Sequence, residues 1–397
     1  MRYIQYMKNY QSVPRLISEK TLSQTARTLL QQLTSRRDIH HAILGMETGD
    51  GTIKKTLAIG KASTESAPIP EAYFIASVTK LFIATTVLKL SEEKLIDLNI
   101  PIVEYFPSGY LQGLHVLKGK EYTAQLTSKH LLSHSSGLPD WLEDRPKGGK
   151  SFLETLLEEE DQSFSFDDLL THVRTRLVPL FPPQPLEQGK VRIRYSDTNY
   201  QLLIALIERI QKRSLDIVFE EKIFRPIGLK KTFFPRVTKN VENGRNDEIG
   251  TTILWAGNEP FLKNHVLAAT RDLYSTPMDQ LAFMKALVKG AVFHRPDTFY
   301  RMTEHWNRFS FPTRAADLRL PGYPIQYGLG IMRFELPRWL TPFGKIPPVI
   351  GHTGSTGSWL FYCPVYDLYL AGTVDQITAG AVPYKFIPKL LHALNQG

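Results

Sequence analysis

A serine and a lysine three residues apart, Ser77 and Lys80, form the first pair in this sequence that could do covalent chemistry. They lie at the predicted start of a helix that runs from Ser77 to about Glu93. Residues i and i+3 share a face of a helix, so the Lys80 amine can reach the Ser77 hydroxyl. The first four N–H groups of a helix lack intrahelical partners, so the Ser77 amide can also stabilise an oxyanion. The pattern predicts an activated serine nucleophile.

The spacing alone is a weak signal, because a Ser-x-x-Lys pair arises easily by chance in a chain of this length. Ser91 and Lys94 have the same spacing at the charged end of the same helix, where a solvated cap is the simpler interpretation. An ordinary helix-capping role stays open for Ser77 as well.

Two further segments strengthen the catalytic interpretation. Tyr195-Ser196-Asp197-Thr198-Asn199-Tyr200 spans a predicted strand-to-helix junction, where Asp197 or Thr198 could also simply cap the helix over 198–212. The stretch Gly351-His352-Thr353-Gly354-Ser355-Thr356-Gly357 precedes a predicted strand over 358–363. It could be a plain glycine-rich turn, but glycines beside a strand also let a substrate approach the backbone.

Several common chemistries have no support in the sequence. It contains no G-x-S-x-G, H-E-x-x-H or P-loop motif. Its single cysteine, Cys363, excludes an intramolecular disulfide and a Cys₄ or Cys₂His₂ zinc site. Cys363 stands in an apolar strand-like stretch, which predicts an inert core thiol.

In this order and spacing, the three segments resemble the serine β-lactamase and penicillin-recognising family. The closest members are class C β-lactamases, D-alanyl-D-alanine carboxypeptidases and the esterases that share their fold. Ser77-Val78-Thr79-Lys80 matches the S-x-x-K motif, Tyr195-Ser196-Asp197 stands where the family has Y-x-N, and His352-Thr353-Gly354 where it has K-T-G or H-x-G. The stretch 130–139 also looks like the family's H-L-L-S-H-T-S-G-L-P text, and the resemblance covers roughly residues 20–395.

The resemblance implies acyl transfer to Ser77, followed by hydrolysis of the acyl-enzyme. Lys80 and Tyr195 would share the proton transfers. The backbone N–H groups of Ser77 and Ser355 would form the oxyanion hole. The residues expected to line the substrate edge are His352, Thr353 and Gly354. No metal or organic cofactor is implied.

Asp197 departs from the family pattern, which usually has Asn at that position. A carboxylate near Lys80 favours the ammonium form of the lysine, which makes Lys80 less suitable as a neutral base. A charged Lys80 would stabilise the tyrosinate form of Tyr195, which favours Tyr195 as the base. For His134, in the 130–139 stretch, we expect a buried structural role rather than a catalytic one.

The expected fold class is α+β, with an antiparallel sheet built from both termini, flanked by helices, and a mainly helical insertion. The predicted helices cover 19–35, 77–93, 198–212, 277–289 and 381–395; the predicted strands cover 41–47, 53–60, 327–334, 358–363 and 366–374. We expect an N-terminal extension over 1–18 and a β-lactamase-like domain over 19–397. Within it, the sheet subdomain would comprise about 19–90 and 265–397, and the helical subdomain about 91–264.

Charge and hydropathy indicate neither a nucleic-acid nor a membrane protein. Lys and Arg total 48 against 39 for Asp and Glu, a formal net charge of +9, but no basic stripe with interleaved aromatic residues appears. We therefore expect a solvated basic surface and no nucleic-acid partner. The sequence has no apolar run long enough to span a bilayer and no visible signal peptide, which predicts a cytoplasmic location.

The expected substrate is a small ester, amide or β-lactam. Because no export signal is visible, an intracellular carboxylesterase-like hydrolase is favoured. The alternatives are a D-amino-acid peptidase or a β-lactamase, and, in another class, a non-catalytic ligand-binding or scaffold relative. The physiological substrate and the oligomeric state are left open by the sequence.

Overall fold

A computed structural model describes residues 15–60, 71–185, 191–235, 250–314, 316–338, 341 and 346–395. The chain forms two compact units. The first comprises residues 1–79, 224–292 and 333–397, and the second comprises 80–223 and 293–332. The subdomain limits expected near 90 and 264 stay a prediction, and residues 1–14 of the expected N-terminal extension lie outside the described residues.

The first unit contains an antiparallel sheet to which both ends of the chain contribute. Its strands run in the order β2-β1-β14-β13-β12-β11. They are β1 (His41–Thr48), β2 (Lys54–Gly60), β11 (Met332–Phe334), β12 (Val349–Thr353), β13 (Trp359–Cys363) and β14 (Leu368–Thr373). The N-terminal strand β1 pairs with the C-terminal strand β14, with Ile43 opposite Thr373 and Thr48 opposite Leu368. The predicted α+β class with a sheet built from both termini is confirmed.

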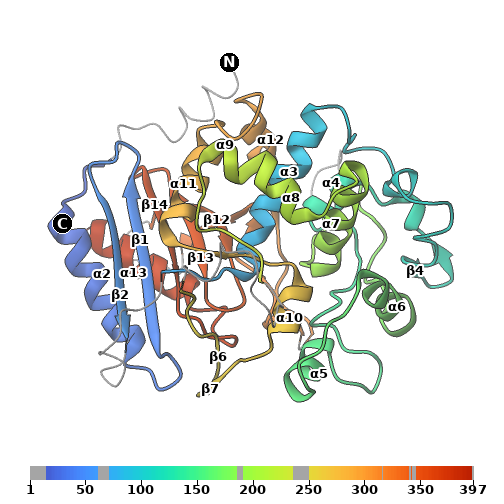
Figure 1. The fold of residues 1–397 in the computed structure, drawn as a ribbon, viewed down its shortest axis with the longest axis horizontal. Helices are drawn as coiled ribbons and strands as arrows, with labels where there is room; N and C mark the ends of the chain where they lie inside the picture. The colour runs from blue at the N-terminus through green and yellow to red at the C-terminus, as the bar shows by residue number, and fades with distance from the viewer. Residues whose placement is uncertain are drawn as a thin grey trace, which may run out of the picture. The chain divides into compact units, whose positions relative to one another are not determined.

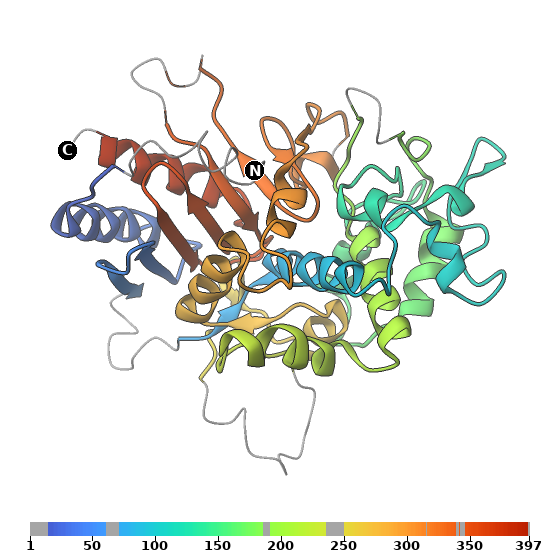
Figure 2. The same cartoon turned by 90° about the horizontal axis from the view of Figure 1, so that it is seen from above.

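Helices cover both faces of this sheet, so β1 is buried on both sides along almost its whole length. Helices α2 (Glu19–Thr34) and α13 (Pro383–Asn395) pack together on one face, and α11 (Pro277–Val288) packs on the other against β1 and β14 (Figures 1 and 2). Gly45 of β1 lets α11 approach closely, since a Cβ there would lie 2.6 Å from the Cβ of Pro277. Phe386 of α13 packs on Trp359 of the sheet at 5.1 Å between ring centroids.

Short elements complete the first unit and carry the segment before Ser77. Strand β3 (Tyr73–Phe74) pairs with β8 (Tyr274–Ser275), and β6 (Trp255–Ala256) pairs with β7 (Glu259–Pro260). The 3₁₀ turn η2 (Ala76–Val78) follows β3, and helices α9 (Arg225–Ile227) and α10 (Asn264–Thr270) also belong here.

The second unit is mainly helical. Its helices are α3 (Thr79–Glu92, which starts at the boundary), α4 (Ser128–Leu132), α5 (Phe152–Glu158), α6 (Phe166–Arg176), α7 (Asp197–Gln211), α8 (Leu215–Phe219) and α12 (Thr298–Thr303). Its short strands are β4 (Val116–Leu117), β5 (Lys120–Glu121), β9 (Asn307–Arg308) and β10 (Gln326–Tyr327). Helix α7 packs against α4 and α8. Helix α3 is buried from Thr79 to Leu90, as its apolar composition requires.

The predicted long helices and most of the predicted strands are confirmed within a few residues. Two differences matter for the site. The strand predicted over 327–334 is interrupted at Gly328–Gly330 into β10 and β11, and Gly330 has a left-handed φ of +78°. Strand β12 was not predicted, because Gly351 and the preceding prolines hide its pattern. It is β12 that carries His352 and Thr353.

Candidate active site

Ser77 stands out in its surroundings by its accessibility. From Ala72 to Leu90, every residue except Ser77 is buried. The flanking chain is fixed on both sides, because the Ile75 N–H donates to the Leu273 carbonyl at 2.9 Å and the Leu273 N–H donates to Thr79 Oγ1 at 3.0 Å. Ala76, directly before Ser77, has a φ of +46°. A residue other than glycine rarely adopts this left-handed conformation, and such strain is commonest at functional sites.

The segment that follows β12 packs against the turn that carries Ser77. Ser358 Oγ donates to the Ile75 carbonyl at 2.8 Å, and Thr356 Oγ1 donates to the Phe74 carbonyl at 3.3 Å. Gly354 permits the approach, since a Cβ there would lie 2.7 Å from the Ile75 oxygen. The sequence predicted a glycine-rich turn next to a substrate edge, and the structure brings this turn to the residues just before Ser77.

Ser355 is exposed in this turn, and Gln376 is hydrogen-bonded to the turn backbone. The Gly354 N–H donates to the Ser358 carbonyl at 2.8 Å, and the Gln376 N–H donates to the Thr356 carbonyl at 3.0 Å. Ser355 is the exposed residue of the turn. The buried Gln376 side chain is also hydrogen-bonded to both backbone groups of Gly257, at 2.8 and 2.9 Å. The sequence analysis missed Gln376, because no local pattern shows which turn it will support.

His352 and Thr353 are both buried, and they occupy adjacent positions of β12. His352 Nδ1 donates to the Thr353 carbonyl at 2.7 Å, since a carbonyl oxygen can only accept. The Thr353 hydroxyl is hydrogen-bonded to the Tyr384 hydroxyl of α13 at 2.7 Å. The Thr353 hydroxyl is therefore held by α13.

In the second unit, Asp197 faces Lys80. Lys80 Nζ lies 2.5 Å from Asp197 Oδ1, and the two side chains are only 5% and 18% exposed. The same Nζ lies 5.3 Å from the ring centroids of both Tyr195 and Tyr200. Asp197 is the first residue of α7, and its carboxylate forms an ion pair with Lys80 there. The Asp197 carboxylate is therefore directed at Lys80.

The loop over 134–144 holds the turn that carries Tyr195 and Asp197. His134 Nδ1 accepts from the Ser196 N–H at 3.1 Å, and Asp140 Oδ2 accepts from the Asp197 N–H at 2.7 Å. The hydroxyls of Ser196 and Thr198 both donate to the Pro139 carbonyl, at 2.9 and 2.6 Å. Residues 134–139 of this loop belong to the 130–139 stretch that resembles the family.

His134 itself is a buried ring inside an aromatic cluster, and its structural role stays a prediction. Its ring centroid lies 4.3 Å from that of Tyr195 and 4.6 Å from that of Tyr327. Tyr327 and Tyr200 share a hydrogen bond of 3.1 Å between their hydroxyls. Burial raises the pKa of both of these hydroxyls, so they remain protonated at neutral pH.

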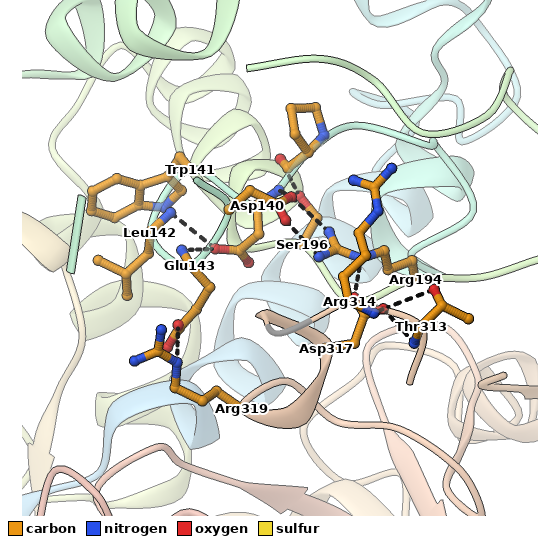
Figure 3. A network of polar contacts seen from close by, with 12 residues as sticks. Asp140, Trp141, Leu142, Glu143, Arg194, Ser196, Thr313, Arg314, Asp317 and Arg319 are labelled. Atoms are coloured by element: carbon orange, nitrogen blue, oxygen red, sulfur yellow. Dashed lines mark hydrogen bonds and ion pairs between the residues drawn. The ribbon is translucent and has the colours of Figure 1, made fainter. Parts of the chain in front are cut away.

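A network of charged side chains surrounds this loop (Figure 3). Arg194, next to Tyr195, makes a bidentate contact with Asp144 at 2.7 and 2.8 Å, and its Nε donates to Asp317 at 2.8 Å. Glu143 pairs with Arg319 at 3.0 Å. Burial raises the pKa of Glu143 to about 7, although Arg319 acts in the opposite direction. Burial also raises the pKa of Asp140, and the charges of the neighbouring Asp197 and Asp144 add to this effect.

The predicted residues thus form two groups, each within one unit. Ser77 lies with the 352–358 segment in the first unit, and Lys80 lies with Tyr195 and Asp197 in the second. Val78 and Thr79 join Ser77 to Lys80, where the 3₁₀ turn η2 continues into α3. The sequence analysis did not single out Asp140 or Gln376, whose partners are distant in sequence.

Three further observations concern the described residues outside this site. Cys363 is buried in β13, and burial raises the pKa of its thiol to about 12, which fits the predicted core role. Within the described ranges, no group of three or more His, Cys, Asp or Glu side chains could hold a metal ion. None of the helices in the described part of the chain is long and apolar enough to cross a membrane.

Comparison with known proteins places these observations in a family. The Beta-lactamase family profile matches residues 30–376. The D-alanyl-D-alanine-carboxypeptidase/endopeptidase AmpH of Escherichia coli K12 is 25% identical over 292 residues, which are 72% of this chain and 66% of AmpH. The chain therefore aligns with slightly less than two thirds of the length of this relative.

Solved structures show the same fold at low sequence identity. The D-amino acid amidase of Ochrobactrum anthropi SV3 superposes with a TM-score of 0.70 at 20% identity, covering 94% of this chain and 98% of the amidase. EstCE1, a hydrolase with promiscuous acyltransferase activity, superposes with a TM-score of 0.67 at 18% identity, covering 95% of this chain and 99% of EstCE1. With the family match over most of its length, the chain belongs to the Beta-lactamase family, a family of β-lactamase-fold serine hydrolases.

Proposed function

We propose that the protein hydrolyses small esters or amides through an acyl-enzyme on Ser77. The observation that carries the proposal is the accessibility of Ser77 within an otherwise buried stretch, one turn before a lysine held in a buried ion pair. Buried charged groups are rare unless they serve a function or a specific partner, and here the partner is itself at a motif position.

In the proposed reaction, Tyr195 in its anionic form accepts the proton of the Ser77 hydroxyl. The Ser77 oxygen attacks the carbonyl carbon of the substrate, and the resulting oxyanion is stabilised by the N–H groups of Ser77 and Ser355. As the tetrahedral intermediate collapses, Tyr195 returns the proton to the leaving alcohol or amine. Water then attacks the acyl-enzyme by the same route and releases the acid. Lys80, paired with Asp197, provides the positive charge that favours the tyrosinate.

His352 supports neutral esters and amides as the preferred substrates. Many relatives carry a lysine at this position, where a fixed cation attracts the carboxylate of β-lactams and of peptides ending in D-alanine. An unperturbed histidine is mostly neutral above about pH 6.5, so that attraction is weaker at neutral pH. We therefore place a carboxylesterase-like activity first. The cytoplasmic location is a further part of this proposal, tested by fractionation of the source cells.

Hydrolysis of D-amino-acid amides or peptides is the second candidate. It is supported by the similarity to AmpH and to the D-amino acid amidase, two proteins whose names record that activity. A β-lactamase activity belongs to the same group of alternatives, and a non-catalytic relative is the alternative from another class.

One experiment separates these candidates. Purified protein is assayed with p-nitrophenyl butyrate, D-phenylalanine amide and a chromogenic cephalosporin, and its intact mass is recorded after brief exposure to each. We expect the highest kcat/KM with the ester, and an acyl adduct that maps to Ser77. Neither turnover nor an adduct with any of the three compounds would favour the non-catalytic relative.

A further inference from the structure

Asp140 is a fully buried carboxylate with three backbone N–H donors. One oxygen, Oδ2, accepts from the Asp197 N–H at 2.7 Å. The other, Oδ1, accepts from the N–H groups of Leu142 and Glu143, at 2.9 and 2.8 Å. Its side chain is 0% exposed. Burying a carboxylate costs several kcal/mol unless it is hydrogen-bonded. The three hydrogen bonds offset this desolvation cost and fix the position of the Asp140 side chain.

The two oxygens of Asp140 connect two segments that are far apart in the sequence. One oxygen binds the loop over 134–144, and the other binds the first turn of α7. The loop is itself anchored, since the Asp140 N–H donates at 2.8 Å to Asp144, whose carboxylate also binds Arg194. Asp140 therefore links the peptide that carries Asp197 to a loop that is anchored through Asp144 and Arg194.

We infer that Asp140 is a positioning residue, which holds the first peptide of α7 so that the Asp197 carboxylate is aimed at Lys80. The contact that depends on it is the 2.5 Å approach between Lys80 and Asp197. A turn that is free to shift by about 1 Å would lengthen this approach, and misplacements of that size commonly cost about a hundredfold in rate. The inference rests on the proposed function, because it assigns a supporting role to the same site.

Asp140→Asn tests this inference, because it changes only one of the three hydrogen bonds of Asp140. A carboxamide has one acceptor oxygen, and the orientation that keeps both loop contacts turns Nδ2 towards the Asp197 N–H. The substitution therefore replaces the hydrogen bond from the Asp197 N–H by a repulsive contact between two donors. The hydrogen bonds from the Leu142 and Glu143 N–H groups are kept. Because Asp140 is fully buried and acts through Asp197, we expect kcat for p-nitrophenyl butyrate to fall at least about tenfold while KM stays within about twofold. The rate at which a fluorophosphonate labels Ser77 should fall by a similar factor.

Glu143→Gln is the matched control. Glu143 is buried in the same loop, but its partner is Arg319 and not the 195–198 turn. We expect its kcat to stay within about twofold of the wild type. If Asp140→Asn does not fold, Thr198→Val takes its place, because it removes the hydroxyl that links the same turn to Trp141 and Pro139 without changing the side-chain volume much. The expected result is again a loss in kcat at constant KM.

The possible outcomes separate this inference from the proposed function. A wild-type kcat in folded Asp140→Asn, or equal losses in Asp140→Asn and Glu143→Gln, overturns the positioning role while the proposed function stands. If Thr198→Val replaces an unfolded Asp140→Asn, an unchanged kcat in Thr198→Val likewise overturns the positioning role. Absence of both turnover and Ser77 labelling in the wild type instead refutes the proposed function, and the inference with it.

Discussion

Lys80 and Asp197 form a buried ion pair, with 2.5 Å between Nζ and Oδ1. Both residues stand at motif positions of the family, but the family usually has a neutral Asn where this chain has Asp197. A full negative charge at this distance stabilises the ammonium form of Lys80. In the proposed mechanism, Lys80 is therefore a source of positive charge near Tyr195 rather than a base, and this distinguishes it from a lysine-based mechanism.

The ion pair leads to a prediction on pH dependence. Asp197→Asn removes the charge that holds Lys80 in its ammonium form, so the pH profile of kcat/KM for p-nitrophenyl butyrate should shift. The variant should also lose about 3 kcal/mol of unfolding free energy in urea, because a buried charge is left without its counter-ion. An unchanged pH profile would show that the Asp197 charge has no part in the proton transfers.

Tyr195 can be tested separately from Asp197 in the same assay. Tyr195→Phe keeps the ring that packs on His134 and removes only the hydroxyl. If Tyr195 is the general base, kcat/KM should fall by at least about a hundredfold. Tyr200→Phe is the control, since its ring lies at the same 5.3 Å from Lys80 Nζ. A comparable loss in both variants would argue against a specific role for Tyr195.

The nucleophile is tested by two serine variants of one helix. Ser77→Ala should abolish ester turnover and covalent labelling by a fluorophosphonate, because the attacking oxygen is lost. Ser91→Ala, the other Ser-x-x-Lys serine, should leave both nearly intact. Peptide mapping of the labelled wild-type protein identifies the modified residue, and a label on any serine other than Ser77 would disprove the assignment.

Replacement of His352 should change the preference for charged substrates. His352→Lys adds a fixed positive charge, so kcat/KM for a carboxylate-bearing cephalosporin should rise relative to that for p-nitrophenyl butyrate at pH 7.5. Because His352 is fully buried, a thermal melt must first show that the variant folds. Faster hydrolysis of the cephalosporin than of the ester by the wild type would favour the β-lactamase alternative.

Glu143 should make the stability of the protein depend on pH. Its folded pKa is raised to about 7, above the ordinary 4.5, so the folded state binds the proton more tightly. The resulting stabilisation is present below about pH 4.5 and is lost as the pH rises through about 7, up to roughly 3 kcal/mol. Urea unfolding at pH 5 and pH 7.5 should show a smaller decrease for Glu143→Gln than for the wild type. Equal decreases would place the Glu143 pKa near its ordinary value.

The Ser77 and Lys80 pair could be predicted from the sequence alone, because its helical spacing is a local property of close neighbours. The class of the fold could be predicted in the same way, since period-two strands at both ends and apolar helices between them are local patterns. Strand β12 could not be predicted from the local sequence. Gly351 interrupts its pattern of buried residues, and two prolines, Pro347 and Pro348, precede it.

The environment of those motif residues depends on tertiary packing and could not be predicted from the sequence. Asp197 could have capped its helix with its side chain, and instead its carboxylate is paired with Lys80. Asp140 and Gln376 belong to no motif, yet each is hydrogen-bonded to a segment that carries a predicted site residue. Such contacts depend on how distant segments pack, and a carboxylate or carboxamide has no local preference that reveals its distant partner. Spacing along the chain therefore indicated which residues could react. Packing between distant segments fixed the hydrogen bonds that hold these residues and the ion pair that stabilises the charge of Lys80.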